Sequence, residues 1–200
     1  CNTELKYAVL SFSSGCKWIT SEPMIVEDNN NWKDLNANGI TDLGMAFEEL
    51  TSMLSRKKFL KSPSLSYAPV IFLMTDGYPT DNYKKGLEKL KNNNWYKYGM
   101  KIALGIGDYF DESVLEEFTE NKELVVKAAN SSQLAKLIKT IAVTSSQIAS
   151  KSMTIVSDEE NELDYEDVEG NKQKEMVKIV QDTVSDDEFI ETLELEDGWD

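Results

Sequence analysis

The chain has 200 residues, of which 40% are hydrophobic, and this suffices for one α/β domain of ordinary size with a tail. Its formal net charge is -15. Residues 151–200 contain 18 acidic and 4 basic side chains, which gives this segment a net charge of -14. The first 150 residues therefore carry the difference, about -1. The acidity excludes binding to nucleic acid and to anionic membranes, which depends on clustered Lys and Arg.

No stretch reaches the roughly 18 to 20 consecutive apolar residues that span a bilayer, and no signal-peptide pattern opens the chain, so we expect a soluble protein. The chain starts at Cys1, where a short polar stretch runs into an apolar segment, and we interpret this start as a truncation. There is no histidine, and the second of the two cysteines is Cys16. Ser-His and Cys-His catalysis is therefore excluded, and a metal site must consist of oxygen ligands, which suit Mg²⁺, Mn²⁺ and Ca²⁺.

The first predicted elements are two strands. Residues 5–13 alternate and then become nearly all apolar, which indicates a strand with at least one buried face. Residues 16–20 follow a Ser-Gly turn and can return as the hairpin partner of this strand. A polar, Asn-rich loop over residues 27–39 then separates the hairpin from the next element.

A helix, a strand and a second helix follow. Residues 41–54 carry apolar side chains at helical spacing, with Thr41 or Asp42 as the natural N-cap. Residues 69–74 (PVIFLM) form a short unbroken apolar run, which is typical of a central parallel strand. Residues 81–91 predict an amphipathic helix.

The same alternation continues to residue 145. A second buried strand is predicted at residues 100–106, a short helix at 111–118, a last strand at 124–128 and a helix at 131–145. This order predicts an α/β fold with a doubly wound, mostly parallel sheet and helices on both faces. In such sheets the binding crevice lies at the carboxyl ends of the strands.

The domain predicted from these elements covers residues 1–152. Residues 153–200 are too rich in Asp and Glu to bury much apolar surface, and we expect an acidic, largely disordered tail, above all over residues 157–170. Within it, residues 172–184 have apolar side chains at helical spacing and predict an amphipathic helix that docks on a partner.

Two segments of this pattern resemble parts of a known metal site. Residues 39–44 (GITDLG) and 70–77 (VIFLMTDG) resemble two of the three elements of the metal-ion-dependent adhesion site, or MIDAS, of von Willebrand factor A (vWA) domains. In that family a loop Thr and an Asp that follows the fourth strand join a DxSxS motif in holding one divalent cation. By motif position the resemblance assigns Thr41 and Asp76 as ligands of Mg²⁺ or Mn²⁺, with an acidic residue of a partner protein completing the coordination.

The resemblance narrows to the TerY-like branch of tellurite-resistance proteins. It covers roughly residues 5–152, and three segments support it: APVIFLMTDGYPTD at 68–81, SVLEEFT at 113–119 and LIKTIAVTSSQIASKS at 137–152. It implies a bacterial, cytoplasmic, non-enzymatic stress-response protein. It also implies a kinase-like protein or a phosphatase of the same system as the partner.

The chain departs from the family in one element, because it contains no DxSxS motif. We interpret the first strand and its motif as lost by truncation, so the complete protein binds the ion while this chain binds it weakly or not at all. An alternative is that residues 177–185 of the tail replace the lost strand and loop, with Asp182 as a ligand. The spacing argues against this alternative, since Ser185 follows Asp182 by three residues where serines at two and four are needed.

Other functions remain as alternatives. One is a metal-independent scaffold, because Thr41 is also a helix cap and Asp76 also a turn residue. Another is a metal-dependent phosphatase of the haloacid-dehalogenase type, in which a second Asp follows the nucleophile by two residues; Tyr78 occupies that position here. The polar neighbours Asp42, Thr80 and Asp81 are interpreted as caps and rim residues.

Overall fold

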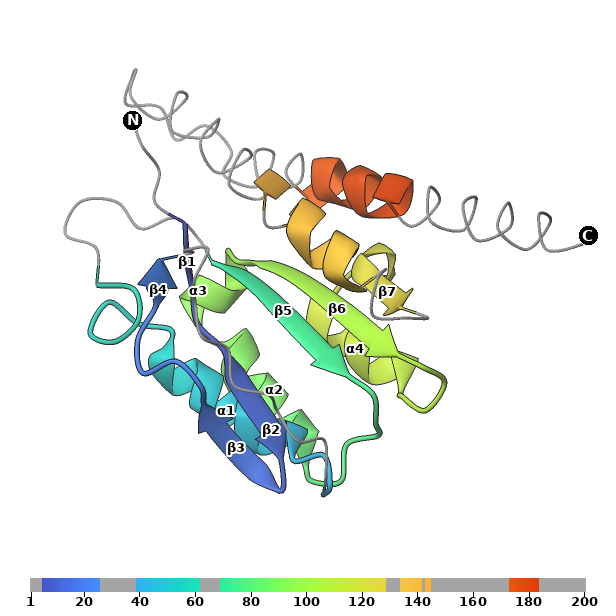
Figure 1. The fold of residues 1–200 in the computed structure, drawn as a ribbon. Helices are drawn as coiled ribbons and strands as arrows, with labels where there is room; N and C mark the ends of the chain where they lie inside the picture. Colours follow the sequence, from blue (N-terminus) through green and yellow to red (C-terminus); the bar gives the residue numbers. More distant parts are fainter. Residues whose placement is uncertain are drawn as a thin grey trace, which may run out of the picture. The chain divides into compact units, whose positions relative to one another are not determined.

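A computed structural model provides the structure of the chain and describes residues 5–25, 39–61, 69–128, 134–141, 143–144 and 173–183. The chain divides into two compact units, shown together in Figure 1. Unit 1 comprises Cys1–Pro69 and Gly77–Met100, and unit 2 comprises Val70–Asp76 and Lys101–Asp200. No helix among the described residues is long and apolar enough to cross a membrane.

Unit 1 contains two small antiparallel sheets. Strand β2 (Leu10–Ser13) pairs with β3 (Gly15–Trp18), and β1 (Lys6–Tyr7) pairs with β4 (Met24–Ile25). The turn between β2 and β3 requires Gly15, whose φ of 86° lies in the left-handed region that other residues avoid. The predicted return of the chain as a hairpin is confirmed, but the single strand predicted over residues 5–13 is divided into β1 and β2, which pair with different strands. The β1–β4 pair was not predicted, because two-residue strands leave no periodic pattern.

Two helices of unit 1 pack through glycine. The apolar faces of α1 (Leu43–Met53) and α2 (Tyr83–Lys91) are buried, as the helical spacing predicted. A Cβ atom at Gly44 would lie 2.8 Å from the carbonyl oxygen of Asn82, and a Cβ atom at Gly86 would overlap the Gly44 carbonyl group. The two backbones therefore approach as closely as they do only because both positions lack a side chain.

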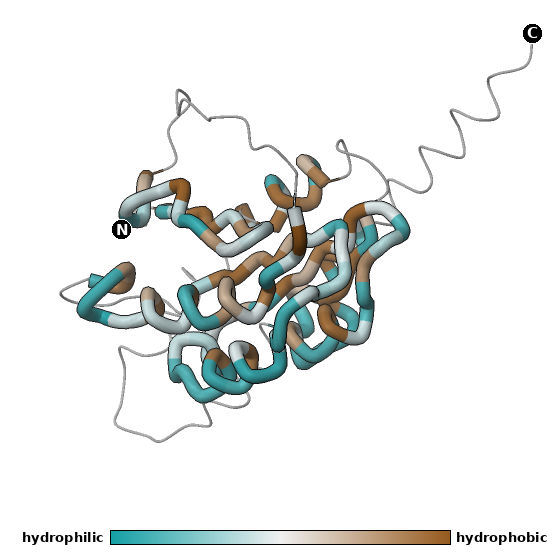
Figure 2. The backbone as a smooth tube through the Cα atoms, turned by 90° about the horizontal axis from the view of Figure 1, so that it is seen from below, coloured by the Kyte–Doolittle hydropathy of each residue, from teal (hydrophilic) through white to brown (hydrophobic). Residues whose placement is uncertain are grey.

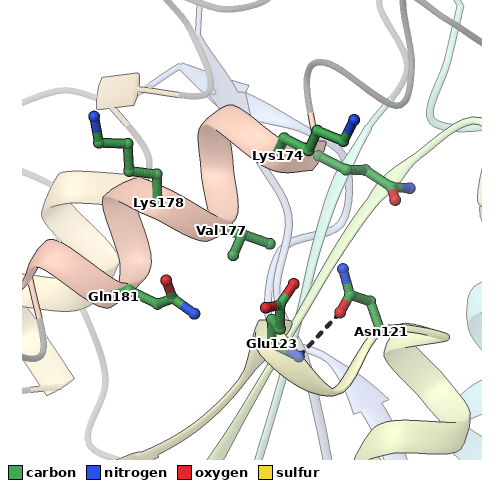
Figure 3. A pocket seen from close by; sticks show the side chains of 7 residues that line it. Asn121, Glu123, Lys174, Val177, Lys178 and Gln181 are labelled. Atoms are coloured by element: carbon green, nitrogen blue, oxygen red, sulfur yellow. Dashed lines mark hydrogen bonds between the residues drawn. The ribbon is translucent and has the colours of Figure 1, made fainter.

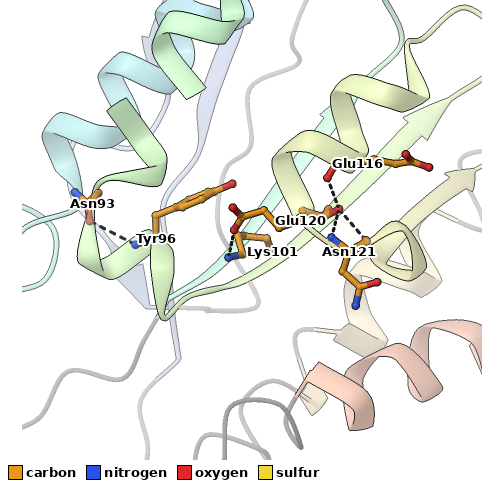
Figure 4. A network of polar contacts seen from close by, with 7 residues as sticks. Asn93, Tyr96, Lys101, Glu116, Glu120 and Asn121 are labelled. Atoms are coloured by element: carbon orange, nitrogen blue, oxygen red, sulfur yellow. Dashed lines mark hydrogen bonds and ion pairs between the residues drawn. The ribbon is translucent and has the colours of Figure 1, made fainter. Parts of the chain in front are cut away.

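A short helix that the sequence analysis missed, α3 (Asn94–Lys97), follows α2 in unit 1. The Asn93 side chain caps it by accepting hydrogen bonds from the backbone N–H groups of Trp95 and Tyr96 (Figure 4). Its amide nitrogen also donates to the carbonyl oxygen of Leu54, just beyond α1. One polar side chain thus connects the two helices and fixes the fully buried Tyr96.

The sheet of unit 2 has the strand order β5-β6-β7, from β5 (Val70–Thr75), β6 (Met100–Ile106) and β7 (Val125–Ala128). Strands β6 and β7 pair in parallel, and Figure 1 shows all three arrows pointing the same way. Helix α4 (Glu112–Thr119) and the 3-10 turn η1 (Lys122–Leu124) connect β6 to β7. The predicted α/β fold with a parallel sheet is therefore confirmed.

The prediction that residues 69–74 form a central strand was wrong for the sheet that the structure describes. Strand β5 pairs with β6 on one side, and no described strand pairs with its other side. Ile71 and Leu73 are buried and Phe72 is half-buried. An unbroken apolar run indicates that both faces of a strand are covered. It does not indicate whether one or both edges of the strand are hydrogen-bonded to neighbouring strands.

The start of β6 and the end of α4 are joined by an ion pair within unit 2 (Figure 4). Lys101 is only 4% exposed, and its Nζ lies 3.1 Å from a carboxylate oxygen of Glu120. Glu120 ends α4 with a φ of 58°, in the left-handed conformation that commonly terminates helices. The adjacent Thr119 hydroxyl donates to the carbonyl oxygen of Asn121 at 2.8 Å.

Residues 134–141 and 173–183 are helical. Met176, Val177 and Val180 of the second helix are buried, at the spacing of one helix face. Figure 2 shows the hydrophobic residues of the chain concentrated in the strands and on the inner sides of the helices. The apolar face of the second helix is therefore covered within the chain, whereas the sequence analysis assigned it to a partner.

The same helix contradicts the alternative in which the tail replaces the lost strand, because residues 177–183 are helical and not extended. The polar side of the helix, with Lys174 and Lys178, lines an open pocket of about 450 Å³ opposite Asn121 and Glu123 (Figure 3). Residues 157–170 lie outside the described residues.

Candidate functional site

Three loops of unit 1 are hydrogen-bonded to one another around Thr41. They are the β2–β3 turn (residues 13–15), the segment before α1 (residues 39–42) and the segment before α2 (residues 77–81), and we name them together the Thr41 loop cluster. The Thr41 N–H donates to the Thr80 hydroxyl at 3.0 Å, and the Thr80 N–H donates to the Thr41 carbonyl oxygen at 2.9 Å. This reciprocal pair fixes the backbone of Thr41 in place.

Asp42 connects the Thr41 loop to the hairpin turn. Its N–H donates to the Ser13 carbonyl oxygen at 2.9 Å, and its carboxylate accepts from the Gly15 N–H at 2.7 Å. Asp42 stands at the N-cap of α1, as the sequence predicted for Thr41 or Asp42, but its side chain makes no capping hydrogen bond. The side chain is therefore used to join two loops.

The capping of α1 comes from Asp81, far away in the sequence. The Asp81 carboxylate accepts from the N–H groups of Gly44 at 2.9 Å and Met45 at 3.0 Å. These are two of the N–H groups at a helix start that have no partner inside the helix. Of the three residues predicted as caps and rim residues, Asp81 caps a helix, Asp42 stands at an N-cap without capping it, and the Thr80 hydroxyl accepts from the Thr41 N–H.

Thr41 and Asp76, which the vWA resemblance assigns as ligands, differ from these residues because no hydrogen bond among the described residues engages their side chains. In the part of the chain that the structure describes, neither the Thr41 hydroxyl nor the Asp76 carboxylate makes a hydrogen bond or ion pair. Asp76 is exposed and directly follows the last residue of β5, at its carboxyl end. Their side-chain oxygens are thus available to a ligand.

Gly77 keeps the space beside Thr41 open. A Cβ atom at Gly77 would lie 2.9 Å from the Thr41 hydroxyl oxygen, closer than real Cβ contacts. Gly77 directly follows Asp76, the other residue that the resemblance assigns as a ligand. The residue after Asp76 therefore lies beside Thr41. The expected closeness of the Asp76 carboxylate to the Thr41 hydroxyl stays a prediction.

The chemistry of the two donors fits a hard divalent cation, for which hydroxyl and carboxylate oxygens are suitable ligands. They supply two of the six ligands that Mg²⁺ requires. Among the described residues there is no group of three or more Asp, Glu, Cys or His side chains arranged to hold a metal ion. An ion at Thr41 and Asp76 therefore needs further oxygens from water or from other residues.

Cys16 lies in the hairpin beside the cluster, and the pKa of its thiol depends on the nearby negative charges. Burial of this side chain raises the pKa of its thiol, and the negative charges of Glu49 and Asp42 raise the pKa further. The thiol is therefore mostly protonated at neutral pH, which lowers its reactivity as a nucleophile.

The parallel sheet with helices around it, and loops gathered in front of two helices, define an α/β domain with a vWA-like fold. The solved structures to which the chain is similar agree. Proximal thread matrix protein 1 from the mussel byssus is 24% identical with a TM-score of 0.51, over 68% of this chain and 35% of that one. The same protein with a zinc-occupied MIDAS motif is 23% identical with a TM-score of 0.51, over 67% and 34%.

A von Willebrand factor type A protein from Catenulispora acidiphila is a weaker match, at 16% identity and a TM-score of 0.49, over 76% of this chain and 34% of that one. No family model and no curated protein matches the sequence. The chain spans about a third of the length of these solved structures. At these identities the likeness to the mussel protein, with a TM-score of 0.51, shows the fold alone.

Proposed function

We propose that the chain is part of a protein-binding vWA module in which Thr41 and Asp76 are two ligands of a divalent cation, Mg²⁺ or Mn²⁺, in the complete protein. The observation that carries this proposal is the contrast within the site. Three neighbouring polar residues, Asp42, Thr80 and Asp81, are used in hydrogen bonds to backbone N–H groups. In the ranges that the structure describes, no hydrogen bond or ion pair engages the side-chain oxygens of Thr41 and Asp76.

The partner protein presents an acidic residue to this ion. A hydroxyl ligand is neutral, so an ion held by one hydroxyl, one carboxylate and water keeps most of its positive charge and attracts a further carboxylate. The mussel protein with a zinc-occupied MIDAS motif supports an ion at this kind of site in the same fold. The resemblance to TerY-like proteins supports a cytoplasmic stress-response role, with a kinase-like protein or a phosphatase as the partner.

In this proposal the chain is not an enzyme. It contains no histidine, its thiol at Cys16 is mostly protonated at neutral pH, and Tyr78 stands where a phosphatase of the haloacid-dehalogenase type has its second Asp. A metal-independent scaffold is the second candidate. It is favoured because no group of three or more Asp, Glu, Cys or His side chains among the described residues is arranged to hold a metal ion.

Calorimetric titration with Mg²⁺ and with Mn²⁺ tests the proposal, on this chain and on a version extended by an upstream strand that carries DxSxS. We expect saturable binding by the extended version, and its loss on Thr41→Ala or Asp76→Asn. Asp108→Asn is the matched control, because Asp108 is an exposed carboxylate in unit 2 paired only with the exposed Lys127.

Unchanged binding in Thr41→Ala and Asp76→Asn would show that the ion is held elsewhere. Absence of binding by the extended version would leave the scaffold as the function. Tight binding by the chain without the added strand would contradict the need for that strand, since two protein ligands hold Mg²⁺ only weakly.

A further inference from the structure

Three large apolar side chains on or beside the Thr41 loop cluster are more than half exposed. Ile40 is 52% exposed, Met45 is 52% exposed and Tyr78 is 56% exposed. Single apolar residues on a surface are ordinary, but a group of them gathered on one site marks an interface. Nothing in the hydrogen bonding of these loops requires an apolar side chain at the three positions.

The hydrogen bonds of the cluster bring these positions together. Ile40 precedes Thr41, and its N–H donates to the Ser14 hydroxyl. Tyr78 follows Gly77, the residue beside the Thr41 hydroxyl. Met45 receives the Asp81 carboxylate on its N–H, and its sulfur lies near the hairpin turn at Gly15. All three positions therefore lie on, or next to, the segments that are hydrogen-bonded around Thr41.

The backbone beneath these side chains is already fixed in the free protein. Asp81 holds the start of α1, and Asp42 holds the hairpin turn. Ordering of loops is one of the main costs of association, and it is avoided when the loops are ordered beforehand. Exposed apolar groups on a preorganised backbone are suited to act as binding anchors.

The charged residues of the cluster are both acidic. They are Asp42 and Asp81. Residues 13–15, 39–45 and 77–81 contain no Lys and no Arg. Without a divalent cation, this surface repels an acidic segment and attracts a basic one. The exposed ring of Tyr78 also offers a face to a cation.

We propose that Ile40, Met45 and Tyr78 form a metal-independent docking surface for a segment of a partner protein that carries a bulky apolar side chain flanked by Lys or Arg. The apolar side chain packs on the three exposed residues, and the basic residues pair with the carboxylates of the cluster. The surface does not depend on an ion at Thr41, so its failure and the failure of the proposed metal site are separate results.

Selection of random peptides displayed on phage, against the whole chain in the presence of EDTA, tests this surface. We expect enrichment of peptides in which a Leu, Ile, Phe or Met stands next to Lys or Arg. The best peptide is then synthesised and its affinity measured by fluorescence anisotropy at low and high salt. We expect the affinity to fall as the salt concentration rises, because surface charge attraction is screened.

Variants identify the surface. Tyr78→Ser and Met45→Gln are expected to lower the affinity for the peptide at least about tenfold, as for anchors in the centre of an interface. Tyr109→Ser is the matched control: Tyr109 is 78% exposed and lies in unit 2, and its loss is expected to leave the affinity within about twofold. All three positions are exposed, so thermal melts of the variants are expected to match the parent.

Three results would overturn the proposal. They are the absence of enriched peptides, the enrichment of acidic peptides in EDTA, and an equal loss of affinity in Tyr78→Ser and Tyr109→Ser. Self-association of the chain that disappears in Tyr78→Ser would also overturn it, by making a second copy the occupant of the surface.

Discussion

Asp81 is the residue on which the Thr41 loop cluster depends most. Its carboxylate serves two N–H groups at the start of α1, and loss of a helix cap costs about 1 to 2 kcal/mol of stability. We therefore expect Asp81→Ala to lower the free energy of unfolding in urea by about this amount. Asp81→Asn, which keeps an oxygen acceptor, is expected to retain most of it. If Asp81→Ala left the free energy of unfolding unchanged, water would replace the carboxylate at no cost in stability.

Cys16 provides a residue-scale test of the electrostatics. Because burial and the nearby carboxylates raise the pKa of its thiol, the reactive thiolate forms only at unusually high pH. In a Cys1→Ser background, alkylation by iodoacetamide is expected to be slower at pH 8 than that of free glutathione, with an inflection at higher pH. Glu49→Gln is expected to shift the inflection down. Faster reaction than glutathione would contradict the burial of the thiol.

Which residues surround the site was foreseeable only where the signal is local. Thr41 and Asp76 stand in contiguous motifs, so the vWA resemblance assigns them as ligands, and this assignment stays a prediction. The partner of the α1 start was not foreseeable, because capping rules search the residues beside a helix, while Asp81 lies 37 residues from Gly44. The exposed positions of Ile40 and Tyr78 were also missed, since an apolar residue in a loop is expected to be buried as often as exposed.

At the scale of elements, the contact between α1 and α2 gives the sharpest prediction. Alanine is favoured over glycine inside a helix by about 1 kcal/mol, so Gly86→Ala alone would stabilise α2. A Cβ at Gly86 would overlap the backbone carbonyl group of Gly44, which cannot move without moving α1. Overpacking of this kind costs about 1 to 3 kcal/mol, so we expect a net loss of stability. Lys85→Ala, an exposed position of the same helix, is the control in thermal melts and is expected to change little.

Most elements were predictable because long amphipathic helices and apolar strands leave a strong periodic signal. The pattern predicted α1, α2, β6 and α4 close to their observed bounds. The β1–β4 pair and α3 are two to four residues long and leave none. The position of β5 in the sheet failed for a different reason, since strand order is set by pairing between distant segments and not by local composition.

At the scale of the whole molecule, the open edge of β5 is the feature with the largest consequence. Strand β5 is apolar from Val70 to Met74, and within the sheet that the structure describes no strand pairs with it on the side away from β6. Such an edge is a template for pairing with another chain. We therefore expect this chain to associate with itself at high protein concentration, measured by sedimentation velocity.

A charge on the strand tests whether β5 is responsible. Met74 is 40% exposed, and Met74→Lys is expected to reduce the association, because exposed lysines block edge-to-edge pairing. Met45→Lys, at an exposed methionine of α1 in unit 1, is the matched control and is expected to leave the association unchanged. The version extended by an upstream DxSxS strand is expected to stay monomeric and to melt at a higher temperature, since the added strand then covers the edge. A chain that remains monomeric at every concentration, or a Met74→Lys variant that associates as strongly as the parent, would show that the β5 edge is already protected.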